Sequence, residues 1–126
     1  MKTSFLSDQA KEFRKKYNLK SSNDRKTRAV QQKIIIEEFK EFLEAEGQLY
    51  MHSPEHQEHA LKELADLVYV CYQYAENMHW FLDEALDRVH KSNMSKLDED
   101  GKPIYREDGK VLKGPNYKPP NLEDLF

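Results

Sequence analysis

Glycine and proline are distributed very unevenly along this 126-residue chain. Between residues 1 and 100 only Gly47 and Pro54 occur, whereas three glycines and four prolines crowd the residues after position 100. Because both residue types interrupt regular helices, the sequence predicts helices over the first four-fifths of the chain. The last fifth is predicted to consist of turns and extended segments.

Apolar residues recur at intervals of three and four along the first part of the chain, which is the period of an amphipathic helix. Ser53 followed by Pro54 predicts a helix start, and we expect Ser4 or Ser7 to cap the first helix and Asp83 to cap the fourth. We therefore predict an all-α fold, a bundle of four to five helices whose core is completed by oligomerisation. The four helices that the pattern outlines cover about residues 6–17, 27–50, 54–77 and 84–96.

The glycine- and proline-rich tail has a different character. Asp108 and Gly109 lie between two short segments, a pattern typical of a tight β-hairpin. We expect an all-α domain over residues 1–97 and an extension over residues 98–126 that packs on the same domain and contains this short hairpin. Residues 114–120 are expected to tie the tail down rather than to close over a site.

The composition argues against several classes of protein. Hydrophobic residues make up 38% of the chain and charged residues 34%, which is rich in charge but not typical of disorder. The formal net charge of −3 gives no reason to expect nucleic-acid binding. No apolar stretch is long enough for a signal peptide or a membrane span. Cys71 is the only cysteine, so no disulfide can form within the chain, and we expect a soluble cytoplasmic protein.

Two acidic groups lie within the second and third predicted helices. The first contains Glu37, Glu38 and Glu41, and the second contains Glu63 and Asp66. Residues three or four apart share one side of a helix, and these acids border the apolar stripe rather than lying opposite it. If the two helices face each other, the carboxylates converge, and their mutual repulsion calls for a hard divalent cation such as magnesium or manganese. The alternative is that they are ordinary solvated acids on helix surfaces.

A third polar group follows at the end of the fourth predicted helix. Asn93 and Lys96 are three residues apart and share one face, so Lys96 could place a cation near a metal-bound polyphosphate. The alternative is a helix C-terminus whose basic residues complement the helix dipole.

Taken together, these groups resemble one family of enzymes. They are similar to the motifs of the MazG-like and phosphoribosyl-ATP pyrophosphatase superfamily of all-α nucleotide pyrophosphohydrolases, over about residues 25–97. The resemblance implies a magnesium site, with manganese as the alternative ion, whose ligands are Glu38, Glu41, Glu63 and Asp66. It also implies that Glu37 is an additional ligand or orients the attacking water, so that the catalytic residues are Glu37, Glu38 and Glu41. Phosphate binding would be carried by Asn93, Lys96 and Lys91.

The resemblance implies an activity as well. The expected enzyme splits a nucleoside triphosphate into the monophosphate and pyrophosphate, and the alternative substrate is phosphoribosyl-ATP. Family members are dimers or tetramers, so a homodimer or homotetramer is expected. The chain departs from the family pattern at Val89, where many members have a lysine, and at Leu97-Asp98, where many have Tyr-Pro. The non-enzymatic alternative is a helical dimerisation or adaptor module.

Other groups of residues allow other interpretations. Glu76 and His79 form an ExxH pair of the kind found in di-iron bundles, but the second pair that such sites need is absent from the sequence. His52, His56 and His59 lie at helical spacing, and we interpret them as surface residues rather than zinc ligands. The aromatic residues considered for stacking on a base are Trp80, Tyr105 and Tyr117.

Overall fold

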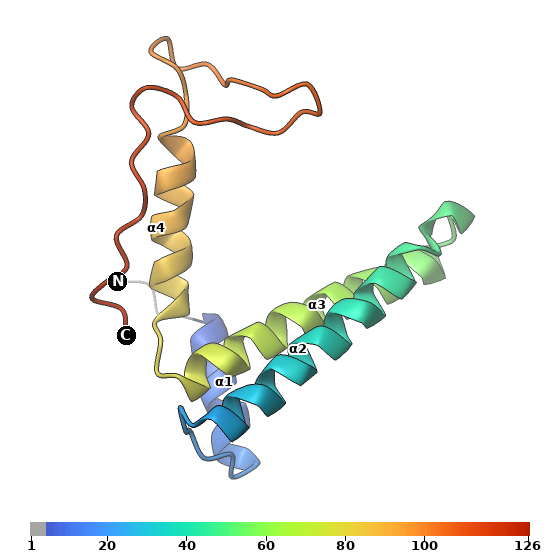
Figure 1. The fold of residues 1–126 in the computed structure, drawn as a ribbon. Coiled ribbons are helices and arrows are strands. Elements are labelled where there is room, and N and C mark those ends of the chain that lie inside the picture. The colour runs from blue at the N-terminus through green and yellow to red at the C-terminus, as the bar shows by residue number, and fades with distance from the viewer. Residues whose placement is uncertain (1–4) are drawn as a thin grey trace. The chain divides into compact units, whose positions relative to one another are not determined.

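A computed structural model of the chain describes residues 5–126, in which helices are the only extended regular structure (Figure 1). Four α-helices are present there, together with the short 3₁₀ helix η1, Leu49–Met51. The prediction of an all-α fold is confirmed. No helix in the described part of the chain is long and apolar enough to cross a membrane. The α-helices are α1 (Phe5–Lys16), α2 (Arg25–Glu46), α3 (Pro54–Asn77) and α4 (Leu82–Met94).

The chain forms two compact units, one ending at Trp80 and the other spanning Phe81–Phe126. In the first unit, α2 and α3 lie side by side as a helical hairpin, and α1 packs against α3 (Figure 1). The second unit contains α4 and the glycine- and proline-rich tail.

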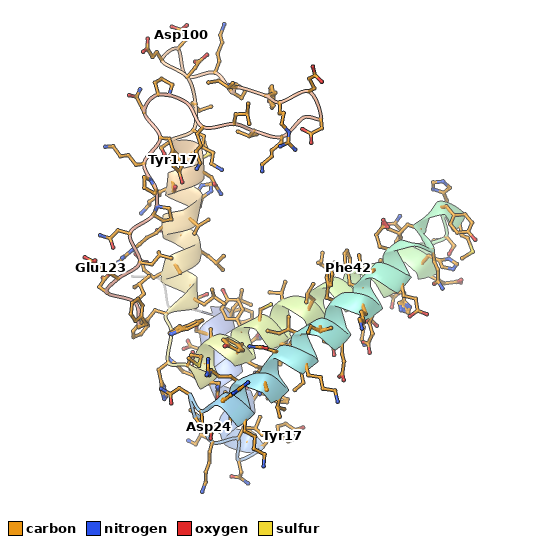
Figure 2. All side chains as sticks on the ribbon, in the orientation of Figure 1. Tyr17, Asp24, Phe42, Asp100, Tyr117 and Glu123 are labelled. Atoms are coloured by element: carbon orange, nitrogen blue, oxygen red, sulfur yellow. The ribbon has the colours of Figure 1, made fainter. Side chains whose placement is uncertain are left out.

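Helix α2 begins and ends earlier than the apolar pattern predicted. Its N-cap is Asp24, labelled in Figure 2, whose carboxylate accepts a hydrogen bond of 2.7 Å from the backbone N–H of Thr27. This bond, with others, lowers the pKa of Asp24, because it favours the ionised form. At the other end the helix stops at Glu46, and Gly47 follows as its C-cap. The predicted end at residue 50 was wrong because the chain tightens there into η1.

Helix α3 has the bounds that its start signal predicted. The Ser53 hydroxyl accepts a hydrogen bond from the backbone N–H of His56, and Pro54 occupies the first turn. Two other residues predicted as caps lie inside their helices instead. Asp83 lies in the first turn of α4, whose N-cap is Phe81, and Ser7 lies within α1. Ser4 lies outside the described residues.

Small side chains and one polar network build the core of the first unit. Arg14 is 6% exposed, and its guanidinium donates to Gln73 Oε1 (3.4 Å) and Asn77 Oδ1 (3.3 Å). The Asn77 side chain in turn bonds both backbone groups of Ser22, which fastens the connection between α1 and α2 to the end of α3. The buried apolar residues of this unit are Ala10, Ala45, Ala60, Tyr72 and Ala75.

Large apolar side chains remain exposed on α2 and α3. A monomer rarely leaves so many of them in contact with water on two adjoining helices. The hairpin therefore offers apolar surface that no other described element of the first unit covers. The most exposed of these residues are Val30, Ile36, Phe39, Leu43, Leu61, Leu64 and Val68.

The tail of the second unit is fastened to α4 by hydrogen bonds. Arg88 pairs with Asp124, and the Ser92 hydroxyl donates a bond of 2.7 Å to the backbone carbonyl of Lys118. The expected β-hairpin is not supported, because only an isolated antiparallel bridge forms, between Tyr105 and Val111. The turn at residues 108–109 is present, but its flanking segments are too short to form strands.

Candidate metal centre

Three of the predicted carboxylates converge between α2 and α3. Glu38 and Glu41 project from α2 and Glu63 from α3, and one carboxylate oxygen of each lies within 4.8 Å of the other two. The spacing of three residues places the two α2 acids on neighbouring turns of one face, opposite the acid of α3. We call Glu38, Glu41 and Glu63 the acid cluster.

Two oxygens of the acid cluster are buried without a hydrogen-bond partner. They are Oε2 of Glu38 and Oε2 of Glu63, and the Glu63 residue as a whole is only 7% exposed. A buried carboxylate oxygen that accepts no bond loses the free energy of hydration without replacement. A cation held between the helices would supply the missing interaction. The donors are all carboxylate oxygens, which suits a hard ion such as Mg²⁺ or Mn²⁺ better than a thiolate- or imidazole-seeking metal.

The electrostatics of Glu38 point the same way. Burial raises the pKa of Glu38, and the negative charges of Glu41, Asp66 and Glu63 raise it further. The ionised form is therefore costly in the folded chain. Any positive charge that enters the acid cluster stabilises it.

A lysine that the sequence analysis overlooked lies beside the acid cluster. Lys62 Nζ is 2.7 Å from Asp66 Oδ2 and 3.5 Å from Glu63 Oε1. These contacts, the one to Asp66 first, raise the pKa of Lys62. His59 Nε2 also lies 3.6 Å from Glu63 Oε1. The spacing of Lys62 and Asp66, four residues apart on one helix, is the signal that could have revealed this contact.

The remaining predicted site residues occupy different settings. Glu37 is exposed on α2 and is not part of the acid cluster. Asp66 pairs with Lys62 and adds negative charge near Glu38. The three residues assigned to phosphate binding all belong to the second unit: Asn93 is exposed, Lys96 is half-buried, and Lys91 Nζ pairs with Asp87 Oδ2 at 2.9 Å.

The aromatic residues considered for a base have contacts of other kinds. The Trp80 ring lies 5.7 Å from that of Tyr74, and Lys113 Nζ lies 4.9 Å from the centre of the Tyr117 ring. Tyr105 forms the isolated bridge with Val111.

Comparison with known proteins agrees with these motifs. The model of the phosphoribosyl-ATP pyrophosphohydrolase family matches residues 4–93, which is more than two thirds of the chain and includes both helices of the acid cluster. No curated protein matches the chain. The tail after α4 lies beyond the matched range. The chain belongs to the phosphoribosyl-ATP pyrophosphohydrolase family, within the MazG-like superfamily of all-α nucleotide pyrophosphohydrolases.

Proposed function

We propose that this protein is a magnesium-dependent nucleotide pyrophosphohydrolase that converts a nucleoside triphosphate into the monophosphate and pyrophosphate. The observation that carries the proposal is the acid cluster, in which three carboxylates converge and two buried oxygens accept no hydrogen bond. The family match supports the class of reaction.

The residues that would hold the ion are Glu38, Glu41, Glu63 and Asp66, with Mn²⁺ as an alternative to Mg²⁺. Bound metal would polarise the phosphate oxygens and lower the pKa of a coordinated water. Asp66 is free to join the three clustered acids once Lys62 releases it, because the pairing of the exposed Lys62 with the half-buried Asp66 is open to solvent and contributes little stability.

The chain's own residues would then position the substrate and handle the proton. Glu37 is exposed and lies next to Glu38, so it is the carboxylate left to orient or deprotonate the attacking water. Lys96, Asn93 and Lys91 are assigned to the phosphates, where positive charge offsets the charge of the transferring and leaving groups.

A second substrate is phosphoribosyl-ATP, and the name of the matched family favours it. It presents its polyphosphate to the same acids, so the acid cluster does not discriminate between the two substrates. A non-catalytic dimerisation module is the third candidate, and it predicts no response to magnesium.

We also propose that two copies of the chain associate through α2 and α3, as a homodimer or a homotetramer. The exposed apolar residues of these helices support this proposal, because a second hairpin would remove them from water. Light scattering on the purified protein should give the mass of a dimer or tetramer. A monomer at micromolar concentration would contradict it. With Cys71 as the only cysteine, we assign the protein to the reducing cytoplasm.

The deciding experiment measures pyrophosphate release with magnesium from ribonucleotides, deoxyribonucleotides and phosphoribosyl-ATP. Glu38→Gln and Asp66→Asn should each abolish release without unfolding the protein. Glu46→Gln, which changes an exposed acid at the end of α2, should retain full activity and serves as the matched control. Full activity in Glu38→Gln or Asp66→Asn would refute the assignment.

A further inference from the structure

A second feature of the first unit is a pocket between α1 and α3. Its volume is about 440 Å³. Three of its six lining residues are aromatic. Five of the six belong to α1 or follow it directly, and the sixth, Tyr69, belongs to α3. The lining residues are Gln9, Glu12, Phe13, Lys16, Tyr17 and Tyr69.

The three aromatic rings form one connected group. The ring centres of Phe13 and Tyr17 are 4.6 Å apart, and Tyr69 meets Phe13 edge to face at 5.6 Å. Tyr17, labelled in Figure 2, is 66% exposed, and Tyr69 is 38% exposed. Much of the surface of both tyrosines is thus open to a partner rather than used in the core.

The contact between α1 and α3 has its own buried residues. Ala10 is buried and its carbonyl accepts a bond from Gln73, and Arg14 donates to Gln73 and Asn77. These residues join the two helices without Tyr17. The ring group therefore adds an aromatic surface beside an interface that is already formed.

The pocket and the acid cluster share one helix. Tyr69 follows Asp66 by three residues, so it lies about 4.5 Å further along the axis of α3 and about 60° around it. From Glu63 to Tyr69 the axial distance is about 9 Å and the rotation around α3 is about 120°, with the partly exposed Asp66 midway between them. A bound nucleotide would follow the surface of α3 past Asp66, with its base at the Tyr69 end and its polyphosphate at the Glu63 end.

We propose that Phe13, Tyr17 and Tyr69 form the binding pocket for the aromatic base of the nucleotide whose phosphates the acid cluster holds. This inference rests on the proposed function. Stacking on a tyrosine or phenylalanine face is sequence-tolerant because every base has a π-face. The polar lining residues Gln9 and Lys16 can bond the edge of the base and would set the preference among bases.

The Tyr69 hydroxyl is suited to donate a hydrogen bond. A tyrosine hydroxyl is protonated at neutral pH, and burial, followed by the charge of Glu12, raises the pKa of Tyr69 further in the same direction. Phe13, whose ring contacts both tyrosines, has no such donor and contributes only contact area.

The test measures binding with α,β-imido nucleotide analogues, which the proposed reaction does not cleave, and with inorganic tripolyphosphate, which has no base. Tyr69→Leu should weaken the analogue of the preferred base roughly tenfold. The same variant should leave the dissociation constant of tripolyphosphate within about twofold, because the acid cluster is intact. Tyr50→Leu is the matched control, since it removes a 74% exposed tyrosine from η1.

A second variant keeps the test decisive if Tyr69→Leu does not fold. Tyr17→Ser changes a mostly exposed ring and should also weaken the analogue while sparing tripolyphosphate. In NMR spectra of the wild type, the ring signals of the three aromatic residues should shift on adding the analogue and not on adding tripolyphosphate.

The outcomes separate the two proposals. If both variants bind the analogue as well as Tyr50→Leu does, or lose tripolyphosphate equally, the base pocket is refuted even when pyrophosphate release is intact. If the analogue binds through Tyr69 but no nucleotide releases pyrophosphate, the pocket stands and the proposed function fails. If no analogue binds the wild type, the base pocket is overturned, and the pyrophosphate-release assay alone decides the proposed function.

Discussion

Replacing Glu38 by glutamine should stabilise the metal-free protein while destroying its response to magnesium. One carboxylate oxygen of Glu38 lies within 4.8 Å of those of Glu41 and Glu63, and Oε2 of Glu38 is buried without a hydrogen-bond partner. Glutamine has nearly the same shape but no charge. The substitution therefore removes like-charge repulsion without leaving a cavity.

The magnitude follows from the separation of the charges. Two unit charges 4.8 Å apart repel by about 1–3 kcal/mol at an effective dielectric constant between about 20, typical of pairs near a protein surface, and about 80. We expect the metal-free variant to exceed the wild type in free energy of unfolding by about this amount at pH 7. Lys62, which already neutralises part of the negative charge, keeps the gain from being larger.

The pH dependence has a definite sign. The folded-state pKa of Glu38 is raised above its ordinary value of 4.5, so the folded chain binds the proton more tightly than the unfolded chain does. The wild type therefore loses stability as the pH rises from the ordinary value through the raised one. Below that window Glu38 is neutral in both states, and the difference between wild type and Glu38→Gln should disappear.

Urea unfolding followed by circular dichroism tests this, at pH 7 and near pH 4, with and without magnesium. Magnesium should raise the stability of the wild type by mass action and leave the variant unchanged, so that the order of the two proteins reverses. The reasoning is refuted if metal-free Glu38→Gln is less stable than the wild type at pH 7. It is also refuted if magnesium stabilises both proteins equally.

Three further changes have expected outcomes. Lys62→Met removes a competing cation, so the dissociation constant for magnesium, measured by calorimetry, should fall several-fold to about tenfold, and an unchanged constant would contradict a role for Lys62. Asn77→Ala leaves buried polar groups unpaired and should cost about 2–3 kcal/mol of unfolding free energy in urea; a loss under half of that would show that the network is dispensable. Gly114→Ala would place its Cβ 2.3 Å from the Leu97 carbonyl oxygen, so amide exchange in Phe81–Phe126 should accelerate. Gly47→Ala, where the nearest atoms are at 3.5 Å, is its control and should be neutral.

What the sequence predicted well was local. The start of α3 was correct because Ser53 and Pro54 act on their own first turn, and a cap depends on nothing further away. The convergence of Glu38, Glu41 and Glu63 was predictable because a spacing of three fixes the face of a helix. The remaining condition was that α2 and α3 pack together, which consecutive helices joined by a short connection usually do.

What the sequence did not reveal depends on tertiary contacts or on competing local geometry. The pocket of Phe13, Tyr17 and Tyr69 exists only because α1 packs on α3, and no pattern within α1 names its partner. The end of α2 was misplaced because the apolar period continues through Leu49 while the backbone already tightens into η1. The hairpin expected around Gly109 was reduced to one bridge because the turn signal was correct but its flanking segments are too short to form strands.

The buried alanines of the hairpin have a consequence for ion selectivity. Ala45 lies four residues after Glu41 on α2, and Ala60 lies three residues before Glu63 on α3; both are almost fully buried. A methyl group is the smallest side chain that still packs, so these positions let the two helix axes approach closely beside the carboxylates. Mg²⁺ is smaller than Ca²⁺ and requires shorter bonds to oxygen. If the proposed ion binds there, its radius would thus be limited by two side chains that are not among its ligands.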